Sequence, residues 1–170
     1  MSLPEAEQLL DTLTERIRPL LDSNTALVGI HSGGAWVAQR LQEKLGGNLP
    51  LGTIPLGMLD ISFYRDDFSR IGLHPQIKPS SIPFDVEGRH IILVDDVLYT
   101  GRTVRAAMNE LFDYGRPASV SLAVLVDRGE RELPIAAQAV GATLALAPGQ
   151  NLELSRDAAG KLALKIHEAT

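Results

Sequence analysis

The chain has 170 residues and a mass of 18.4 kDa, a length that suits a single domain spanning residues 1–170. A hydrophobic share of 45% with 22% charged residues excludes a mainly disordered chain, and the lack of cysteine excludes disulfides, zinc–thiolate sites and cysteine nucleophiles. The formal charge of -5 works against broad adhesion to nucleic acid, and no apolar run approaches the roughly 18 residues of a membrane span. We therefore expect a cytoplasmic protein.

The N-terminal segment has the pattern of an amphipathic helix. Ser2 is a possible N-cap, and Pro4 suits a first helical turn. Leucine and isoleucine then recur every three or four residues from Leu9 to Leu21, which places them on one buried stripe. The sequence predicts a helix that begins near Ser2 and ends near residues 23–24.

A strand, a glycine turn and a second helix follow. Residues 26–30 are a short apolar run typical of a strand buried on both faces, and residues 31–34 read His-Ser-Gly-Gly. Apolar residues at helical spacing then predict a helix over 35–45. A further strand region is expected within 51–64, and the polar, proline-rich residues 65–83 predict a long mobile loop or a hairpin.

Residues 91–94 form the clearest buried strand, and a helical stripe resumes from Val104 to Phe112. Further strands are predicted at residues 120–126, 143–146 and 162–166. This alternation predicts an α/β fold with a mostly parallel sheet, because parallel neighbours require crossover connections. The turns after Ile30, Val94 and Val126 then all lie at carboxyl ends of strands, where ligands of such sheets bind.

The loop after the 91–94 strand combines two kinds of ligand-binding group. Asp95 and Asp96 follow an aliphatic strand, where two carboxylates need polar surroundings. They could lie in a solvated turn, cap the N-terminus of a helix or bind a ligand. Residues 100–103, Thr-Gly-Arg-Thr, supply hydroxyls, a glycine and the N–H groups of a helix start, an arrangement that suits a phosphate. A sugar phosphate has both the hydroxyls and the phosphate that such a loop would bind.

The run of residues 91–103 resembles the phosphoribosyl-pyrophosphate (PRPP) signature of the type I phosphoribosyltransferases. The wider stretches 60–67 and 115–135 resemble one branch, the PyrR family of pyrimidine-operon regulators and uracil phosphoribosyltransferases. The resemblance implies the type I phosphoribosyltransferase fold, a central mostly parallel sheet flanked by helices, with a flexible hood loop at about 64–84. It also implies that uracil and PRPP give uridine monophosphate (UMP) and pyrophosphate, and that Mg²⁺ arrives bound to PRPP rather than in a metal site of the protein.

The resemblance assigns roles to individual residues. Asp95 and Asp96 would hold the ribose hydroxyls and favour the positive charge that builds on the sugar ring. Arg65, in the hood, would contact pyrophosphate, or it would pair with a neighbouring carboxylate. The substrate-binding residues would be Ser32, Gly33, Val97, Leu98, Tyr99, Thr100, Gly101, Arg102, Thr103, Asp127 and Arg128. Many PyrR proteins have Thr-Arg-Gly where this chain has Ser32-Gly33-Gly34, so one guanidinium that could contact pyrophosphate is missing here.

A second function stays open beside the enzyme: a regulator that senses UMP or uridine triphosphate (UTP), binds operon RNA and has weak or no catalysis. The charge pattern argues against RNA binding, since residues 1–24 carry five acidic and two basic side chains, and residues 127–170 carry six and five. A receiver domain fits poorly, because here the acidic pair follows a central strand and leads into the Thr-Gly-Arg-Thr loop. A Walker-type nucleotide site also fits poorly, because Met58 stands where that motif needs lysine. The resemblance further implies a homodimer or a higher homo-oligomer.

Overall fold

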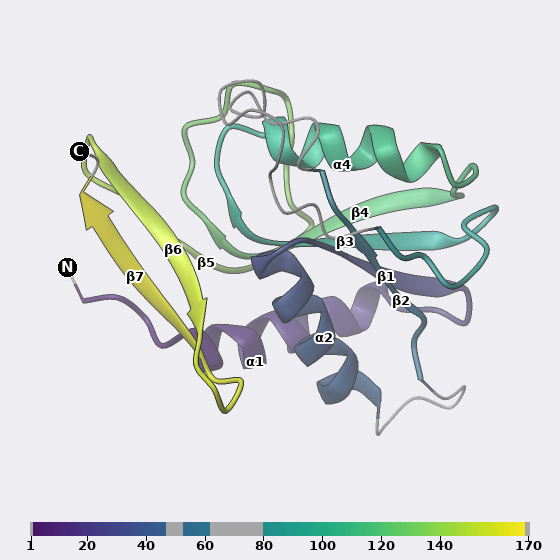
Figure 1. The fold of residues 1–170 in the computed structure, drawn as a ribbon, viewed down its shortest axis with the longest axis horizontal. Coiled ribbons are helices and arrows are strands. Elements are labelled where there is room, and N and C mark those ends of the chain that lie inside the picture. Colours follow the sequence, from purple (N-terminus) through teal and green to yellow (C-terminus); the bar gives the residue numbers. More distant parts are fainter. Residues whose placement is uncertain (1, 47–52, 62–79, 169–170) are drawn as a thin grey trace.

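The computed structural model describes residues 2–46, 53–61 and 80–168. They form a five-stranded parallel sheet with helices on both faces and a separate two-stranded hairpin (Figure 1). In chain order the elements are α1 (Ala6–Ile17), a 3-10 helix (Arg18–Leu20), β1 (Thr25–Ile30), α2 (Gly33–Gly46), β2 (Leu56–Leu59), β3 (His90–Leu98), α4 (Arg102–Phe112), β4 (Ser119–Asp127), β5 (Ala139–Thr143), β6 (Gln150–Arg156) and β7 (Leu162–Glu168). This is the predicted α/β architecture.

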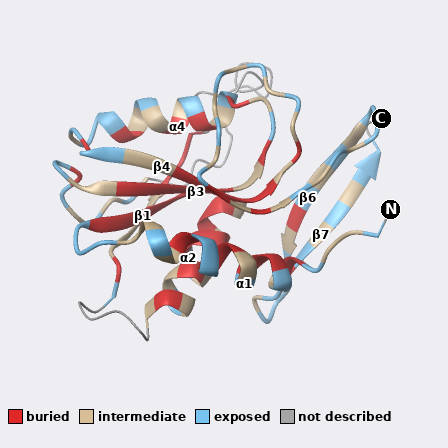
Figure 2. Ribbon diagram, turned by 180° about the vertical axis from the view of Figure 1, so that it is seen from behind, coloured by how far each residue is buried: buried red, intermediate tan, exposed pale blue. Residues whose placement is uncertain are grey.

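The sheet has the strand order β2-β1-β3-β4-β5, with β3 in the middle. Successive residues of β1 point to opposite faces, so Leu27 packs beneath α1 and α2 while Val28 packs beneath α4. Figure 2 shows that the buried residues concentrate in the central strands and on the helix faces that meet them. The continuous apolar run of β1 is thus explained by two cores, one on each face of the sheet.

The strand β3 is longer than predicted. It continues past Val94 to Leu98, because its pairing with β4 continues from Asp95 opposite Val124 to Leu98 opposite Asp127. The acidic pair therefore lies in the last part of a central strand rather than in the turn that follows it.

The first helix is shorter than predicted at both ends. It begins at Ala6, and Glu5, not Ser2, is the N-cap residue and keeps an extended backbone. The α-helix ends at Ile17 because Pro19 has no N–H to donate to the carbonyl four residues back, and the chain continues as a 3-10 turn. The second predicted helix is confirmed as α2.

The C-terminal third departs most from the prediction. The strand β5 ends at Thr143, where the predicted strand 143–146 begins, and β6 was not predicted at all. Gly141 in β5 is packed closely by backbone, since a Cβ there would lie 2.4 Å from the Leu125 carbonyl oxygen. The predicted terminal strand is β7, and it pairs antiparallel with β6 to form a hairpin beside α1.

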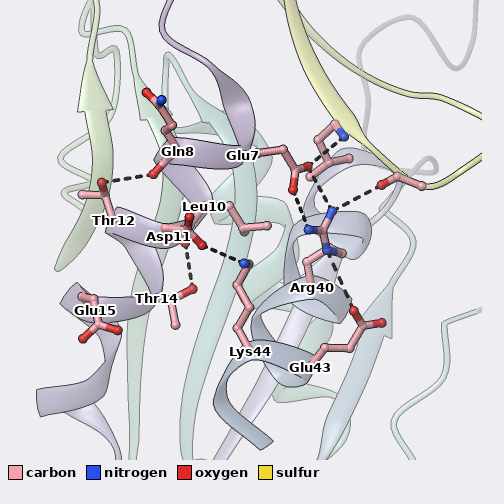
Figure 3. A network of polar contacts seen from close by, with 12 residues as sticks. Glu7, Gln8, Leu10, Asp11, Thr12, Thr14, Glu15, Arg40, Glu43 and Lys44 are labelled. Carbon is pink, nitrogen blue, oxygen red and sulfur yellow. Dashed lines mark hydrogen bonds and ion pairs between the residues drawn. The ribbon is translucent and has the colours of Figure 1, made fainter.

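An ion pair fastens this hairpin to the helices (Figure 3). The Arg40 guanidinium donates to both Glu7 carboxylate oxygens, at 2.5 and 3.0 Å, and to the Gly160 carbonyl at 3.3 Å. Glu7 also accepts from the Leu162 N–H at 3.0 Å. The hydrogen bond from Arg40 is the main cause that holds the pKa of Glu7 below its usual range. One carboxylate thus joins α1, α2 and β7.

Replacing Glu7 by glutamine is expected to lower the free energy of unfolding at neutral pH by about 1–2 kcal/mol, because a bidentate charged pair becomes one neutral contact. Since the folded pKa of Glu7 is lowered, its contribution is complete above about pH 4.5 and is lost as the pH falls below that value. Denaturant unfolding of both proteins between about pH 7 and pH 3 measures this, and the two curves should converge in acid.

Glu43→Gln is the matched control. Glu43 also faces Arg40, but at 3.9 Å and with a side chain that is 71% exposed. It should change stability by less than about 0.5 kcal/mol. Equal losses from the two substitutions would show that the geometry around Arg40 contributes nothing beyond surface charge.

Across the described ranges, no helix combines the length and the apolar character needed to cross a membrane.

Candidate functional site

The turn between β1 and α2 touches the end of β3. A Cβ placed on Gly33 would lie 2.1 Å from Asp96 Oδ2, and one on Gly34 would lie 2.5 Å from the Val94 carbonyl oxygen. At Gly34 the nearest neighbours are backbone atoms, so only glycine fits there, whereas at Gly33 the neighbour is the Asp96 side chain. This packing brings the start of α2 directly against the acidic pair, so the first two turns expected at the carboxyl edge meet there.

The two aspartates have different surroundings. Asp95 is 6% exposed, and its Oδ1 accepts from the Asp96 N–H at 2.8 Å. Asp96 is partly exposed, and its Oδ1 accepts from the Val97 N–H at 2.8 Å. Neither is a helix N-cap, since that position before α4 belongs to Gly101. Asp96 is therefore the carboxylate closer to solvent, whereas Asp95 is buried.

The loop that follows turns tightly into α4. Gly101 has a φ of 97°, in the left-handed region that favours glycine, and a Cβ there would lie 2.9 Å from Ile135 Cγ1. Thr100 Oγ1 accepts from the Arg102 N–H at 3.2 Å. The loop delivers the positive end of the α4 dipole to the same edge of the sheet as the acidic pair, an arrangement that suits an anion.

The segment after β4 holds this loop in place. Arg131 donates through Nη1 to the Tyr99 carbonyl at 3.0 Å, through Nη2 to Asp127 Oδ2 at 2.6 Å and through Nε to the Ile135 carbonyl at 2.8 Å. The backbone N–H groups of Glu132 and Leu133 both donate to the Thr100 carbonyl, at 2.9 and 3.0 Å. These hydrogen bonds were not predicted, because the sequence showed only an ordinary charged turn at residues 127–131.

Asp127 is engaged within the protein. Burial raises the pKa of Asp127, but the Arg131 guanidinium and the Gly129 N–H outweigh it, so the pKa of this carboxyl lies below its usual range. One oxygen faces Arg131, and the other accepts from Gly129 at 2.9 Å. Asp127 therefore stays ionised at neutral pH, and both oxygens support the turn.

A cavity of about 240 Å³ opens beside the loop. Its wall includes Tyr99, Arg128, Glu130 and the turn at residues 147–151. The Arg128 guanidinium lies 3.9 Å from the centre of the Tyr99 ring, on its face. The turn at 147–151 leads into β6, so the strand that sequence reasoning missed also contributes to this cavity.

Most of the predicted site residues lie at the carboxyl edge of the sheet. Leu98 differs, because its side chain is 2% exposed within the core and only its carbonyl, which accepts from the Arg128 N–H, faces the turn. Arg65 and most of the expected hood lie outside the described residues, and within 80–84 Ser81 bridges to Met58 of β2. The predicted residues at the carboxyl edge are Ser32, Gly33, Asp95, Asp96, Val97, Tyr99, Thr100, Gly101, Arg102, Thr103, Asp127 and Arg128.

The chain is similar to known proteins over most of its length. Residues 2–147 match the phosphoribosyl transferase domain family. The "Bifunctional protein PyrR" of Nitrosococcus oceani is 59% identical over 143 residues, which are 84% of this chain and 79% of that protein. The protein of the same name from Pseudomonas fluorescens is 54% identical over 159 residues, 91% of this chain and 92% of that one.

Solved structures show the same fold. A hypoxanthine phosphoribosyltransferase from Staphylococcus aureus superposes with a TM-score of 0.64 at 20% identity, covering 89% of this chain and 80% of that one. A purine phosphoribosyltransferase from Pyrococcus horikoshii gives 0.60 at 25% identity, covering 81% and 82%. With a type I fold, a matching domain model and close relatives over most of its length, the chain belongs to the PyrR family of phosphoribosyltransferases.

Proposed function

We propose that this chain transfers the phosphoribosyl group of PRPP to uracil, forming UMP and pyrophosphate, and that it also acts as a regulator that responds to UMP or UTP. One observation carries the proposal: the end of β3 and the short loop into α4 place two aspartates and a helix N-terminus on one edge of the sheet, with the glycine turn of α2 against the aspartates. The name of the relatives, "Bifunctional protein PyrR", supports the pairing of two roles.

The chemistry follows from where charge develops. The bond between the anomeric carbon and pyrophosphate breaks, and the bonding pair leaves with pyrophosphate. Uracil N1 then supplies the pair for the new C–N bond and loses its proton to solvent. The ring carries positive charge between these events, and the carboxylates of Asp95 and Asp96 stabilise that charge without accepting a proton. The N–H groups at the start of α4 receive the 5-phosphate, and those around Ser32 and Gly33 receive pyrophosphate.

Magnesium enters this scheme with the substrate. Within the described ranges, no three histidine, aspartate or glutamate side chains form a group that could hold a metal ion. We propose that the cation is ligated mainly by the oxygens of PRPP, and Asp96, the more accessible carboxylate of the pair, would be the protein group available to it. When bound, Mg²⁺ neutralises charge on the leaving pyrophosphate.

An assay of phosphoribosyl transfer across uracil, guanine, hypoxanthine and orotate tests the proposal. UMP should be the only nucleotide formed at an appreciable rate. Transfer to a purine, or failure of the protein to bind PRPP with Mg²⁺, would overturn the assignment.

The regulatory role has a test of its own. Retention of pyrimidine-operon leader RNA on the protein should be measured as a function of salt, with and without UMP, because binding to phosphates weakens steeply with salt. Retention that is specific and changes with UMP supports an RNA-binding regulator. Equal retention of unrelated RNA would exclude this mode of regulation.

Replacing Arg131 by lysine is expected to raise the Kd for PRPP about three- to tenfold. Lysine keeps the charge, but one ammonium cannot reproduce hydrogen bonds that diverge to Tyr99, Asp127, Gly129 and Ile135. Calorimetric titration measures the change. Arg105→Lys on the exposed side of α4 is the control and should leave the Kd unchanged.

A further inference from the structure

Arg128 is a buried cation with unused hydrogen-bonding capacity. Its side chain is only 7% exposed. In the described part of the chain the guanidinium makes two side-chain hydrogen bonds, both through Nη2: to the Gln150 carbonyl at 3.2 Å and to Glu130 Oε2 at 3.4 Å. Its Nε is buried and has no hydrogen-bond partner there. A guanidinium has five N–H donors, so most of its capacity is unused.

A purely structural role does not account for this arrangement. Removing a charged group from water is unfavourable unless hydrogen bonds and a counter-ion replace the lost hydration. The nearest carboxylate, Glu130, is 55% exposed and contacts Arg128 at 3.4 Å, which makes a weak pair. Glu130 itself has a φ of 60°, an unfavourable backbone conformation for a residue other than glycine. The protein thus retains an incompletely satisfied cation and a strained neighbour in the wall of one cavity.

The position of the cavity indicates what Arg128 would contact. Tyr99 directly precedes residues 100–103, which would bind the 5-phosphate of the ribose. The cavity therefore opens next to the place where a bound ribose would lie. Tyr99 is 43% exposed, whereas Arg128 on its ring face is nine-tenths buried, so Arg128 belongs to the closed side of the cavity. A base whose N1 points to the ribose directs its opposite edge, which carries the substituent at ring position 4, toward that closed side.

We propose that Arg128 determines which pyrimidine is accepted, by donating from its guanidinium to the oxygen at ring position 4 of uracil, while the Tyr99 ring fixes the plane of the guanidinium. This inference rests on the proposed function and adds the group that selects the base. Uracil presents an acceptor at that position, whereas cytosine presents an amino group. Two facing donors repel each other, so the same contact that favours uracil rejects cytosine.

Binding of the product nucleotides tests this without relying on turnover. UMP and CMP are titrated calorimetrically into wild type, Arg128→Met and Arg128→Lys, and the thermal midpoint of each protein is recorded. We expect Arg128→Met to weaken UMP binding about 10- to 100-fold, to strengthen CMP binding because the repelling donor is removed, and to leave the Kd for PRPP unchanged. Because the buried charge is poorly satisfied, the thermal midpoint should not fall. Arg128→Lys should restore part of the preference, and Arg105→Met should alter none of these values.

Two results would overturn the inference. The first is an equal loss of UMP and CMP affinity in Arg128→Met, which would make Arg128 a wall of the cavity rather than its selective group. The second is a marked fall in the thermal midpoint of Arg128→Met with the UMP-to-CMP preference intact, which would assign Arg128 a structural role. If Arg128→Met fails to fold, the UMP-to-CMP preference of Arg128→Lys tests the inference instead. Failure of the proposed function looks different, because wild type itself would then bind neither PRPP nor UMP.

Discussion

Asp95→Asn combined with Asp96→Asn is expected to lower kcat/KM for phosphoribosyl transfer by roughly 30- to 1,000-fold, equivalent to about 2–4 kcal/mol of transition-state free energy. Asparagine keeps the size of the side chain and an oxygen that can accept from the backbone N–H groups of Asp96 and Val97. The fold should therefore survive while the negative charge is lost. Initial rates of UMP formation with both substrates varied measure the effect.

The two single variants should divide this loss unequally. Asp96 is the more accessible carboxylate, so Asp96→Asn should account for most of the fall in kcat/KM, whereas buried Asp95 should also affect stability. Asp113→Asn, an exposed residue at the far end of α4, makes the same change in charge away from the site and should have no effect. If the double variant retained wild-type kcat/KM, these carboxylates would have no part in the reaction.

Local patterns were enough to predict the centre of this fold. The apolar runs that became β1, β3 and β4 are covered on both faces, so their composition alone marked them as parallel strands. The segment from the end of β3 to the start of α4 was predictable as well, because its acids, hydroxyls and glycine are contiguous in the sequence. Residues 99–103 follow directly on the strand that carries the acids.

The remaining features depend on contacts between distant residues. The strand β6 forms because it pairs with β7 and because its Leu154 joins the hydrophobic core that includes α1. The seven residues of β6 alone do not reveal either contact. Arg131 looks like any surface arginine until its four acceptors come together around it. The C-terminal end of α1 followed a single local rule, the effect of Pro19, which the helical spacing of the leucines concealed.

Gly34→Ala should lower the free energy of unfolding by about 1–3 kcal/mol, because the added Cβ would lie 2.5 Å from the Val94 carbonyl oxygen and 2.9 Å from the Asp95 Cα. Both atoms belong to the backbone of the central strand, which cannot move aside. Gly46→Ala, in the same helix but with no atom within 4 Å, should instead be neutral or slightly stabilising. Denaturant unfolding of the two variants compares them directly, and similar stabilities would mean that α2 can shift away from β3.

Gly33→Ala makes the same chemical change one residue earlier, yet its main effect should be on activity. Here the Cβ would meet a side chain, Asp96 Oδ2 at 2.1 Å, which can rotate away at little cost to the fold. A rotated carboxylate no longer faces the sugar, so kcat/KM should fall about 10- to 100-fold while the thermal midpoint changes little. The effect must also depend on Asp96: in an Asp96→Asn background, Gly33→Ala should reduce kcat/KM much less, because the charge that it displaces is already absent. If the two losses simply multiplied, the alanine would be acting on pyrophosphate binding at the start of α2 instead of through Asp96.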